Sequence, residues 1–136
     1  MNINETISHL NWAAIFVAAL STFLMGGLWY SIFEKQWMFV NKFTKEELAQ
    51  RNLPFVFGLS FLFSFIMALN LAMFIGTNAT AAYGLLAGFL TGFGWVFFSL
   101  AIISLFEKRS FKYVLINGGY MTIAFSGMGA ILGAWH

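Results

Sequence analysis

The chain has 136 residues, of which 60% are hydrophobic and only 9% are charged. A soluble domain carries about 25% charged residues and could not hide this much apolar surface, so a soluble globular protein is excluded and a lipid bilayer is the expected solvent. The net charge is only +2 and there is no cysteine, so membrane lipids are the expected partners rather than nucleic acid, and disulfides, thiolate metal sites and thiol nucleophiles are excluded.

Four apolar segments are each long enough to cross a bilayer as a helix, which needs about 20 residues. Lipid cannot satisfy backbone hydrogen-bonding groups, so helices are the only reasonable structure for them. The sequence predicts an all-α fold, with one integral membrane domain over residues 1–136 built as a four-helix bundle. The predicted spans are residues 10–33, 54–76, 81–106 and 113–135.

The segment after the first span is the only sizeable stretch outside the bilayer. Thr44-Lys45-Glu46-Glu47 fits a capping box, in which Thr44 caps a helix and Glu47 reaches back to it. A short amphipathic helix over residues 45–52 is therefore expected. Aromatic residues and lysines precede it, which indicates an interfacial segment on the inner leaflet, either an ordinary connector or a docking site for a cytoplasmic partner.

All seven Lys and Arg residues lie in two loops, those that follow the first and the third spans. The loop at residues 77–80 and both ends of the chain hold none. Because cytoplasmic loops carry an excess of Lys and Arg, we expect both basic loops in the cytoplasm and both termini outside.

Similar pentapeptides close the first and third spans. Residues 31–35 read SIFEK and residues 104–108 read SLFEK. One interpretation is a duplicated hairpin, with the two copies related by an axis along the membrane normal. The other is a chance match in a chain rich in few residue types.

Glycines recur at intervals of four residues in the third and fourth spans. Residues four apart share one helix face, and glycine lets another backbone approach closely there. This glycine-zipper pattern predicts close packing, either between spans of one chain or at the seam of a homo-oligomer. The glycines concerned are Gly84, Gly88, Gly92, Gly129 and Gly133.

The predicted spans contain no charged residue, which counts against ion-coupled or proton-coupled transport, because a membrane-embedded charge costs at least about 2.5 kcal/mol and is kept mainly for function. The strongest polar groups are Asn70 and Asn117. Trp95 lies near the middle of the third span, and Tyr120 lies in the fourth. We expect these four residues to form polar contacts between helices or to line a small cavity.

No catalytic arrangement is recognisable, so neither an enzymatic activity nor a cofactor is expected. A metal site is not expected either. The two histidines, His9 and His136, both fall on the outer side, and Glu5 is the only further ligand near them.

Five residues at the end of the first span and just after it carry a resemblance to a known family: Trp29, Tyr30, Ser31, Phe33 and Trp37. They are similar to the W-Y-S-P and F-G-x-x-W segments of the bacterial four-span membrane family catalogued as domain of unknown function 1761, and residues 44–47 are similar to its T-x-E-E stretch. Ile32 and Glu34 stand where the family usually has proline and glycine. The resemblance implies four spans and a bacterial inner membrane, and it supplies no activity.

Two functions compete at this point. The first is a non-enzymatic packing or accessory protein, acting as a homo-oligomer or as a subunit of a membrane complex, and it rests on the glycine faces and the absence of buried charge. The second is a small permease or channel for a neutral or lipophilic solute, lined by Asn70, Trp95, Asn117 and Tyr120. A membrane enzyme ranks last.

Overall fold

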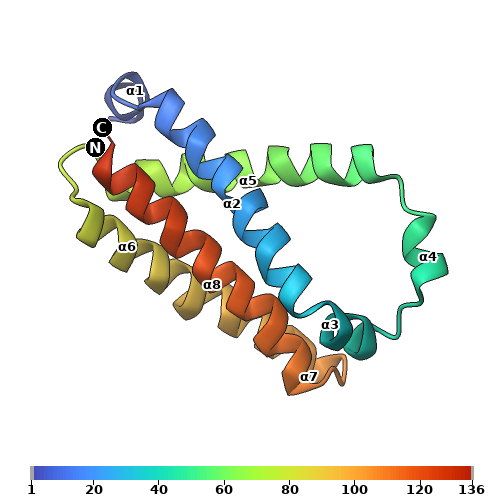
Figure 1. The fold of residues 1–136 in the computed structure, drawn as a ribbon. Coiled ribbons are helices and arrows are strands. Elements are labelled where there is room, and N and C mark those ends of the chain that lie inside the picture. Colours follow the sequence, from blue (N-terminus) through green and yellow to red (C-terminus); the bar gives the residue numbers. More distant parts are fainter. Residues whose placement is uncertain (1, 136) are drawn as a thin grey trace.

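A computed structural model describes residues 2–135 of the chain. Within these residues every regular element is helical (Figure 1), so the all-α prediction is confirmed. His136 lies outside the described residues.

Four helical segments are long and apolar enough to cross a membrane, which confirms the predicted number of spans. The third segment is continuous but changes from α-helix to π-helix and back. Each segment begins and ends within about two residues of its predicted bounds. The segments are α2 (Trp12–Ile32), α5 (Leu53–Ile75), α6 (Ala81–Phe89) with η1 (Leu90–Phe97) and α7 (Phe98–Phe106), and α8 (Phe111–Ala134).

The four spans share one device for starting. At each N-cap a short polar side chain accepts a hydrogen bond from the backbone N–H three residues further on, which satisfies a donor that has no partner inside the helix. These caps fix where each span leaves its loop. They are Asn11, Asn52, Thr80 and Ser110.

Three short helices lie outside the spans: α1 (Ile3–Ser8), α3 (Glu34–Asn41) and α4 (Lys45–Ala49). Thr44 caps α4 as predicted, because its hydroxyl oxygen accepts from the Glu47 N–H at 3.2 Å. The helix is shorter than predicted, since Asn52 serves as the cap of α5.

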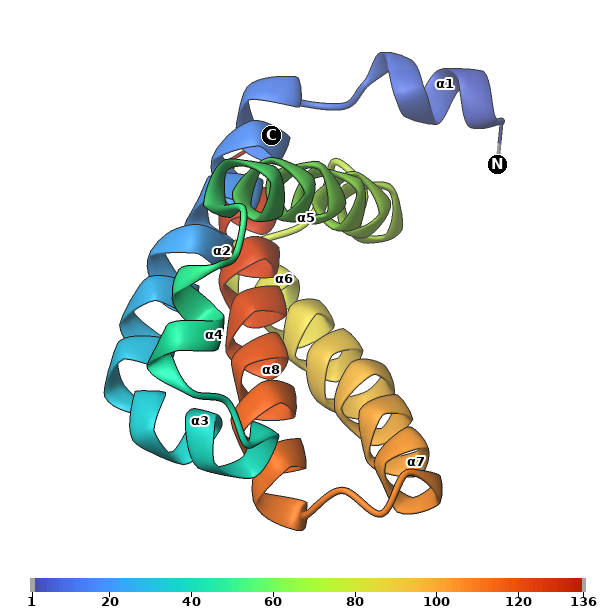
Figure 2. The same cartoon turned by 90° about the vertical axis from the view of Figure 1, so that its right-hand side faces the viewer.

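The helices pack most closely at the end of the molecule that holds α1. The buried residues of α5 all lie in its C-terminal third, whereas its N-terminal half diverges from α2 and α8 toward the opposite end (Figures 1 and 2). The bundle is therefore wedge-shaped. Its core is formed by Ala14, Ile15, Ala18, Ala19, Ala68, Leu71, Ile75, Phe125, Met128 and Leu132.

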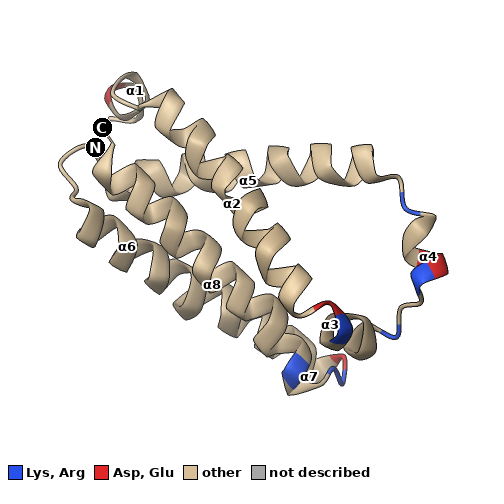
Figure 3. Cartoon of the chain, in the orientation of Figure 1, with Lys and Arg blue, Asp and Glu red and all other residues tan. Residues whose placement is uncertain are grey.

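The charged side chains are segregated along the molecule. Every Lys and Arg lies at the open end of the wedge, on α3, the turn after it, α4, the turn before α5, the turn after α7 and the first turn of α8 (Figure 3). The α1 helix and the last turn of α8 lie at the closed end (Figure 1).

The two similar pentapeptides have different local structures. After Ile32 the chain passes directly into α3, whose first residue is Glu34. After Phe106 it instead turns, with Lys108 in the left-handed region at φ 58°. The likeness of residues 31–35 and 104–108 therefore does not extend to the backbone that follows each span.

Candidate functional site

The glycine faces of the third and fourth spans pack against each other within the chain. A methyl group at Gly84 would overlap the carbonyl oxygen of Gly129, and one at Gly88 would overlap that of Phe125. At Gly92 an added carbon would lie 2.7 Å from the Cα of Thr122, and one at Gly133 would overlap the Thr80 carbonyl oxygen. Both glycine rows are occupied by backbone of the same chain.

The π-helical segment keeps this interface continuous. Gly84, Gly88 and Gly92 face α8 at intervals of four residues, and the next buried residue of the span is Phe97, five residues on, which covers Gly118. A π turn holds one residue more than an α turn. One additional residue is thus accommodated without turning α7 away from α8.

Two consecutive aromatic residues of α2 bind two consecutive residues of α8. Trp29 donates its indole N–H to the Ile116 carbonyl at 2.9 Å. Tyr30 donates its hydroxyl to Oδ1 of Asn117 at 2.7 Å. Asn117 in turn donates its amide N–H to the Tyr113 carbonyl of its own helix.

Aromatic side chains cover glycines in both directions across the same interface. Trp29 lies over Gly119, where an added carbon would be 2.9 Å from its ring, and Tyr120 of α8 lies over Gly26 of α2, where it would be 3.0 Å from the hydroxyl. The Tyr120 hydroxyl donates to the Thr22 carbonyl at 2.9 Å. Because each large ring lies opposite a glycine, α2 and α8 can approach closely. The phenol rings of Tyr30 and Tyr120 lie side by side in this contact.

The other residues of the family motif extend this cluster toward α3. Trp37 packs edge-on against Tyr30, with ring centroids 6.0 Å apart, and against Phe43 at 5.3 Å. Phe33 packs on Trp29, with ring centroids 4.7 Å apart. Ser31 is exposed, and its hydroxyl donates to the Gly27 carbonyl within α2.

A cavity of about 760 Å³ lies in the opening of the wedge, between α2, α5 and α8. We call it the wedge cavity. Its wall combines aromatic rings with hydroxyl groups from three spans. At the open end of the wedge, where the Lys and Arg residues lie and which we call the basic end, α3 and α4 complete the wall. Its principal lining residues are Thr22, Gly26, Gly27, Tyr30, Trp37, Phe57, Ser60, Ser64 and Tyr120.

The polar groups of the wedge cavity are neutral inside the spans and charged only at the basic end. Thr22 and Ser64 have hydroxyl oxygens 3.0 Å apart, a hydrogen bond between α2 and α5. Glu34 and Arg51 lie on the wall at the basic end, and neither forms an ion pair with any residue among 2–135. The cavity can hydrogen-bond a neutral solute and pack against an apolar chain, and it places no charge at depth.

The residues singled out from the sequence fall into two regions. Tyr120 lines the wedge cavity, and Tyr120 and Asn117 line an adjoining depression of about 500 Å³. Asn70 and Trp95 lie elsewhere, in a depression of about 750 Å³ between α5 and η1. Asn70 donates to the Ile66 carbonyl of its own helix, and Trp95 is 65% exposed and packs edge-on against Phe74.

Sequence reasoning missed most of the wedge wall. Thr22, Ser60, Ser64, Gly26 and Gly27 were not singled out, although Ser60 and Ser64 are four residues apart and so share a face of α5. That hydroxyl pair was the available signal. The divergence of α5, which opens the cavity, leaves no comparable trace in the pattern.

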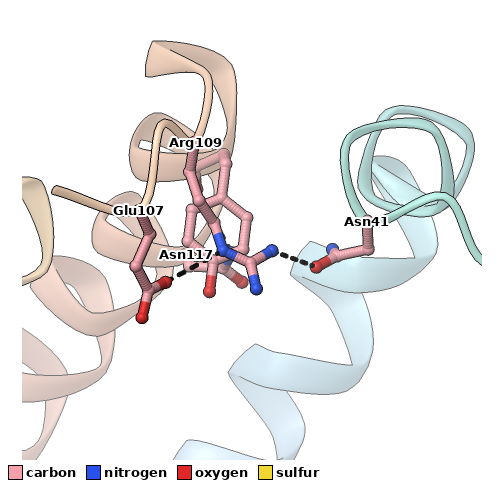
Figure 4. Close-up of polar contacts among 5 residues, drawn as sticks. Asn41, Glu107, Arg109 and Asn117 are labelled. Atoms are coloured by element: carbon pink, nitrogen blue, oxygen red, sulfur yellow. Dashed lines mark hydrogen bonds and ion pairs between the residues drawn. The ribbon is translucent and has the colours of Figure 1, made fainter. Parts of the chain in front are cut away.

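At the basic end, one arginine links the two loops (Figure 4). Arg109 forms an ion pair with Glu107 at 3.2 Å and donates to Oδ1 of Asn41, at the end of α3, at 3.5 Å. Its guanidinium also lies 4.6 Å from the centre of the Tyr113 ring. The turn after α7 is thereby attached to the end of α3.

Comparison with known proteins identifies the family. A family model described as protein of unknown function (DUF1761) matches residues 13–133, and the chain therefore belongs to this family. Neither the curated proteins nor the solved structures contain a match.

Proposed function

We propose that this member of the DUF1761 family is a non-enzymatic membrane permease that takes up a neutral or lipophilic solute in the wedge cavity. The protein would lie in a bacterial inner membrane with its basic loops in the cytoplasm and both termini outside, as the segregation of Lys and Arg favours. The wedge would then open toward the cytoplasm.

The observation that carries this proposal is the wall of the wedge cavity. Ligand sites of about 300–1,000 Å³ are usually mostly apolar with a few placed polar groups. The wedge cavity is of this size at about 760 Å³, and the polar side chains of its wall inside the spans carry hydroxyl groups. A neutral solute carries no charge, so its entry into the cavity would not require the dehydration of an ion.

The glycine packing also shifts the balance between the two sequence-based functions. The argument for a homo-oligomer relied on glycine faces that a second copy could use. These faces are covered by backbone of the same chain, so that argument loses its main support.

A filled-cavity variant tests the proposal. Gly27 lines the wedge cavity and has no atom within 4 Å of where a Cβ would be, so the side chain of Gly27→Leu starts in open space on the cavity wall. Gly58→Leu is the matched control, since Gly58 of α5 is equally open and does not line the cavity. The probe is a diazirine derivative of octanol, a neutral amphiphile, with labelled residues located by mass spectrometry.

We expect labelling at Tyr30 and Tyr120 in the wild type and in Gly58→Leu, and its loss in Gly27→Leu. Flux of neutral solutes such as glycerol and urea, followed by light scattering of proteoliposomes, should fall in the same variant only. Tyrosine labelling that is absent from the wild type, or equal in both leucine variants, would contradict a solute site in the wedge.

A second candidate is an accessory or packing role as a homo-oligomer or complex subunit, and Asn70 favours it. Its amide is exposed on a spanning helix and bonds only within α5, while its Oδ1 has no partner among residues 2–135. An asparagine amide in lipid gains from a partner on another helix. A second copy would supply one. Native mass spectrometry should then show a dimer that Asn70→Leu dissociates, and a wild-type monomer with no retained protein would remove this candidate.

A further inference from the structure

A further cavity lies at the basic end of the molecule and shares no lining residue with the wedge cavity. Residues 38–43, from the end of α3, and residues 107–110, from the turn after α7, line an open depression of about 1070 Å³. We call it the loop cavity. The bond between Arg109 and Asn41 holds its two sides together (Figure 4).

Two lysines give the loop cavity an unbalanced positive charge. Lys42 comes from one side and Lys108 from the other, and both are exposed. Among residues 2–135 neither forms an ion pair, whereas the charges of Arg109 and Glu107 are paired with each other. The wall therefore presents two free ammonium groups.

The backbone at these lysines is unusual in the same way. Lys42 and Lys108 have φ angles of 57° and 58°, and they are the only described residues other than glycine with positive φ. Each follows the last turn of a helix, a position at which glycine is preferred because it has no Cβ. The chain does use glycine at the corresponding end of α5, where Gly76 has φ 78°. Lysine at both walls of one cavity is thus a departure from the expected residue.

The side chains around the loop cavity place it at the boundary of the hydrocarbon. Phe39 is 79% exposed, and Leu105 and Phe106 are 79% and 86% exposed. Large apolar side chains this exposed beside lysines are typical of a segment that lies in the lipid interface. A ligand of the cavity would therefore have its anionic group beside the lysines and its apolar part in the membrane.

We propose that the loop cavity binds the headgroup of an anionic phospholipid, with the phosphate held between Lys42 and Lys108. Basic pockets on the cytoplasmic side of membrane helices recognise such headgroups through charge. Arg109 positions the two walls, because its own charge is already balanced by Glu107. The site is separate from the wedge cavity and does not depend on the function proposed for that cavity.

The test compares lipid binding by native mass spectrometry in mild detergent, with phosphatidylglycerol and phosphatidylcholine as probes. The test variant carries Lys42→Gly and Lys108→Gly, because glycine suits the left-handed backbone and should keep or raise the unfolding temperature. The control carries Lys45→Gln and Lys112→Gln, which remove the same charge from outside the cavity.

Each basic residue near an anionic surface contributes roughly fivefold to binding, so the double glycine variant should bind phosphatidylglycerol roughly 25-fold more weakly than the wild type. The control should bind phosphatidylglycerol close to the wild-type affinity, because Lys45 and Lys112 lie outside the cavity, and phosphatidylcholine binding should not change. Equal losses in both variants, an unchanged affinity in the glycine variant, or no preference for phosphatidylglycerol in the wild type would each overturn the proposal.

Discussion

Consecutive residues Trp29 and Tyr30 join α2 to α8 at two points, Ile116 and Asn117. The most specific part of the family resemblance therefore lies at a contact between spans. Because the same tyrosine lines the wedge cavity, packing and the proposed solute site depend on one side chain.

The Tyr30 bond can be isolated by a double-mutant cycle. Tyr30→Phe and Asn117→Leu each remove one partner, and the double variant removes both. Bonds between membrane helices contribute about 0.6 kcal/mol on average and at most about 1.7 kcal/mol, so we expect a coupling free energy in that range. Reversible unfolding in mixed micelles measures it, and additive single effects would show that the bond does not stabilise the fold.

Gly88 should tolerate no side chain. Gly88→Ala places a methyl group against the Phe125 carbonyl oxygen, and only movement of one helix backbone relieves the overlap. Forcing atoms into a close-packed contact costs about 1–3 kcal/mol, and the unfolding free energy should fall accordingly. Gly58→Ala, at an open position of α5, is the control and should be neutral or slightly stabilising, because alanine favours a helix more than glycine does. Equal stability of the two variants would contradict the α6–α8 contact.

At the residue scale the sequence predicts contact positions better than it predicts cavity positions. Glycine spacing identified the face of α6 that packs closely, since a missing side chain has a local consequence. It could not tell whether the partner was α8 or a second copy. Asn70 and Asn117 look alike in the sequence, yet only Asn117 bonds across helices, because the direction in which each faces depends on how the spans are arranged.

Among the elements, the third span is unusual because it contains a π-helical segment, η1. The segment inserts one residue between Gly92 and Phe97, so that both face α8. Deletion of Gly94 should convert η1 to α-helix and keep α7 in register. Deletion of Ser99, also exposed but within α7, should turn the rest of α7 by about 100° and bring Ser104 out of its buried position.

Thermal unfolding in detergent checks this pair. The Gly94 deletion should unfold close to the wild type, and the Ser99 deletion should be aggregated or strongly destabilised. A Gly94 deletion as damaging as the Ser99 deletion would show that the π segment does not absorb the additional residue.

Element boundaries followed from the sequence because they are set locally. Loss of apolar character and a capping side chain mark each start, as at Asn52 and Ser110. The helix α3 was missed, since its mixture of aromatic and charged residues has no cap or clear period. The π segment was missed too, because its only trace is a change of spacing from four residues to five.

For the whole molecule, the segregation of charge makes orientation testable independently of function. The chain has no cysteine, so single cysteines at Thr44 and Thr77, both exposed in loops, can be labelled without background. An impermeant maleimide should label Thr77→Cys from outside intact cells and Thr44→Cys only after the membrane is opened. The reverse labelling pattern would mean that the protein is inserted in the opposite orientation and that the wedge opens to the outside.

The four-span plan follows from composition, whereas the wedge does not. Apolar length specifies how many helices cross the bilayer, but lipid-facing and helix-facing apolar side chains look the same in the sequence. The angle of α5 depends on a core confined to Ala68, Leu71 and Ile75 at one of its ends, and this is visible only in three dimensions.

The accessibility of a single residue in the wedge cavity tests the central claim most directly. Ser60 lines the wedge cavity, whereas Leu62, two residues along α5, is 49% exposed and lies outside it. A charged methanethiosulfonate reagent added from the side of the basic loops should modify Ser60→Cys, and Gly27→Leu should slow that reaction. Leu62→Cys should not react, since thiolate is scarce in lipid. An unreactive Ser60→Cys, or equal rates at the two positions, would contradict a solute-accessible cavity between α2, α5 and α8.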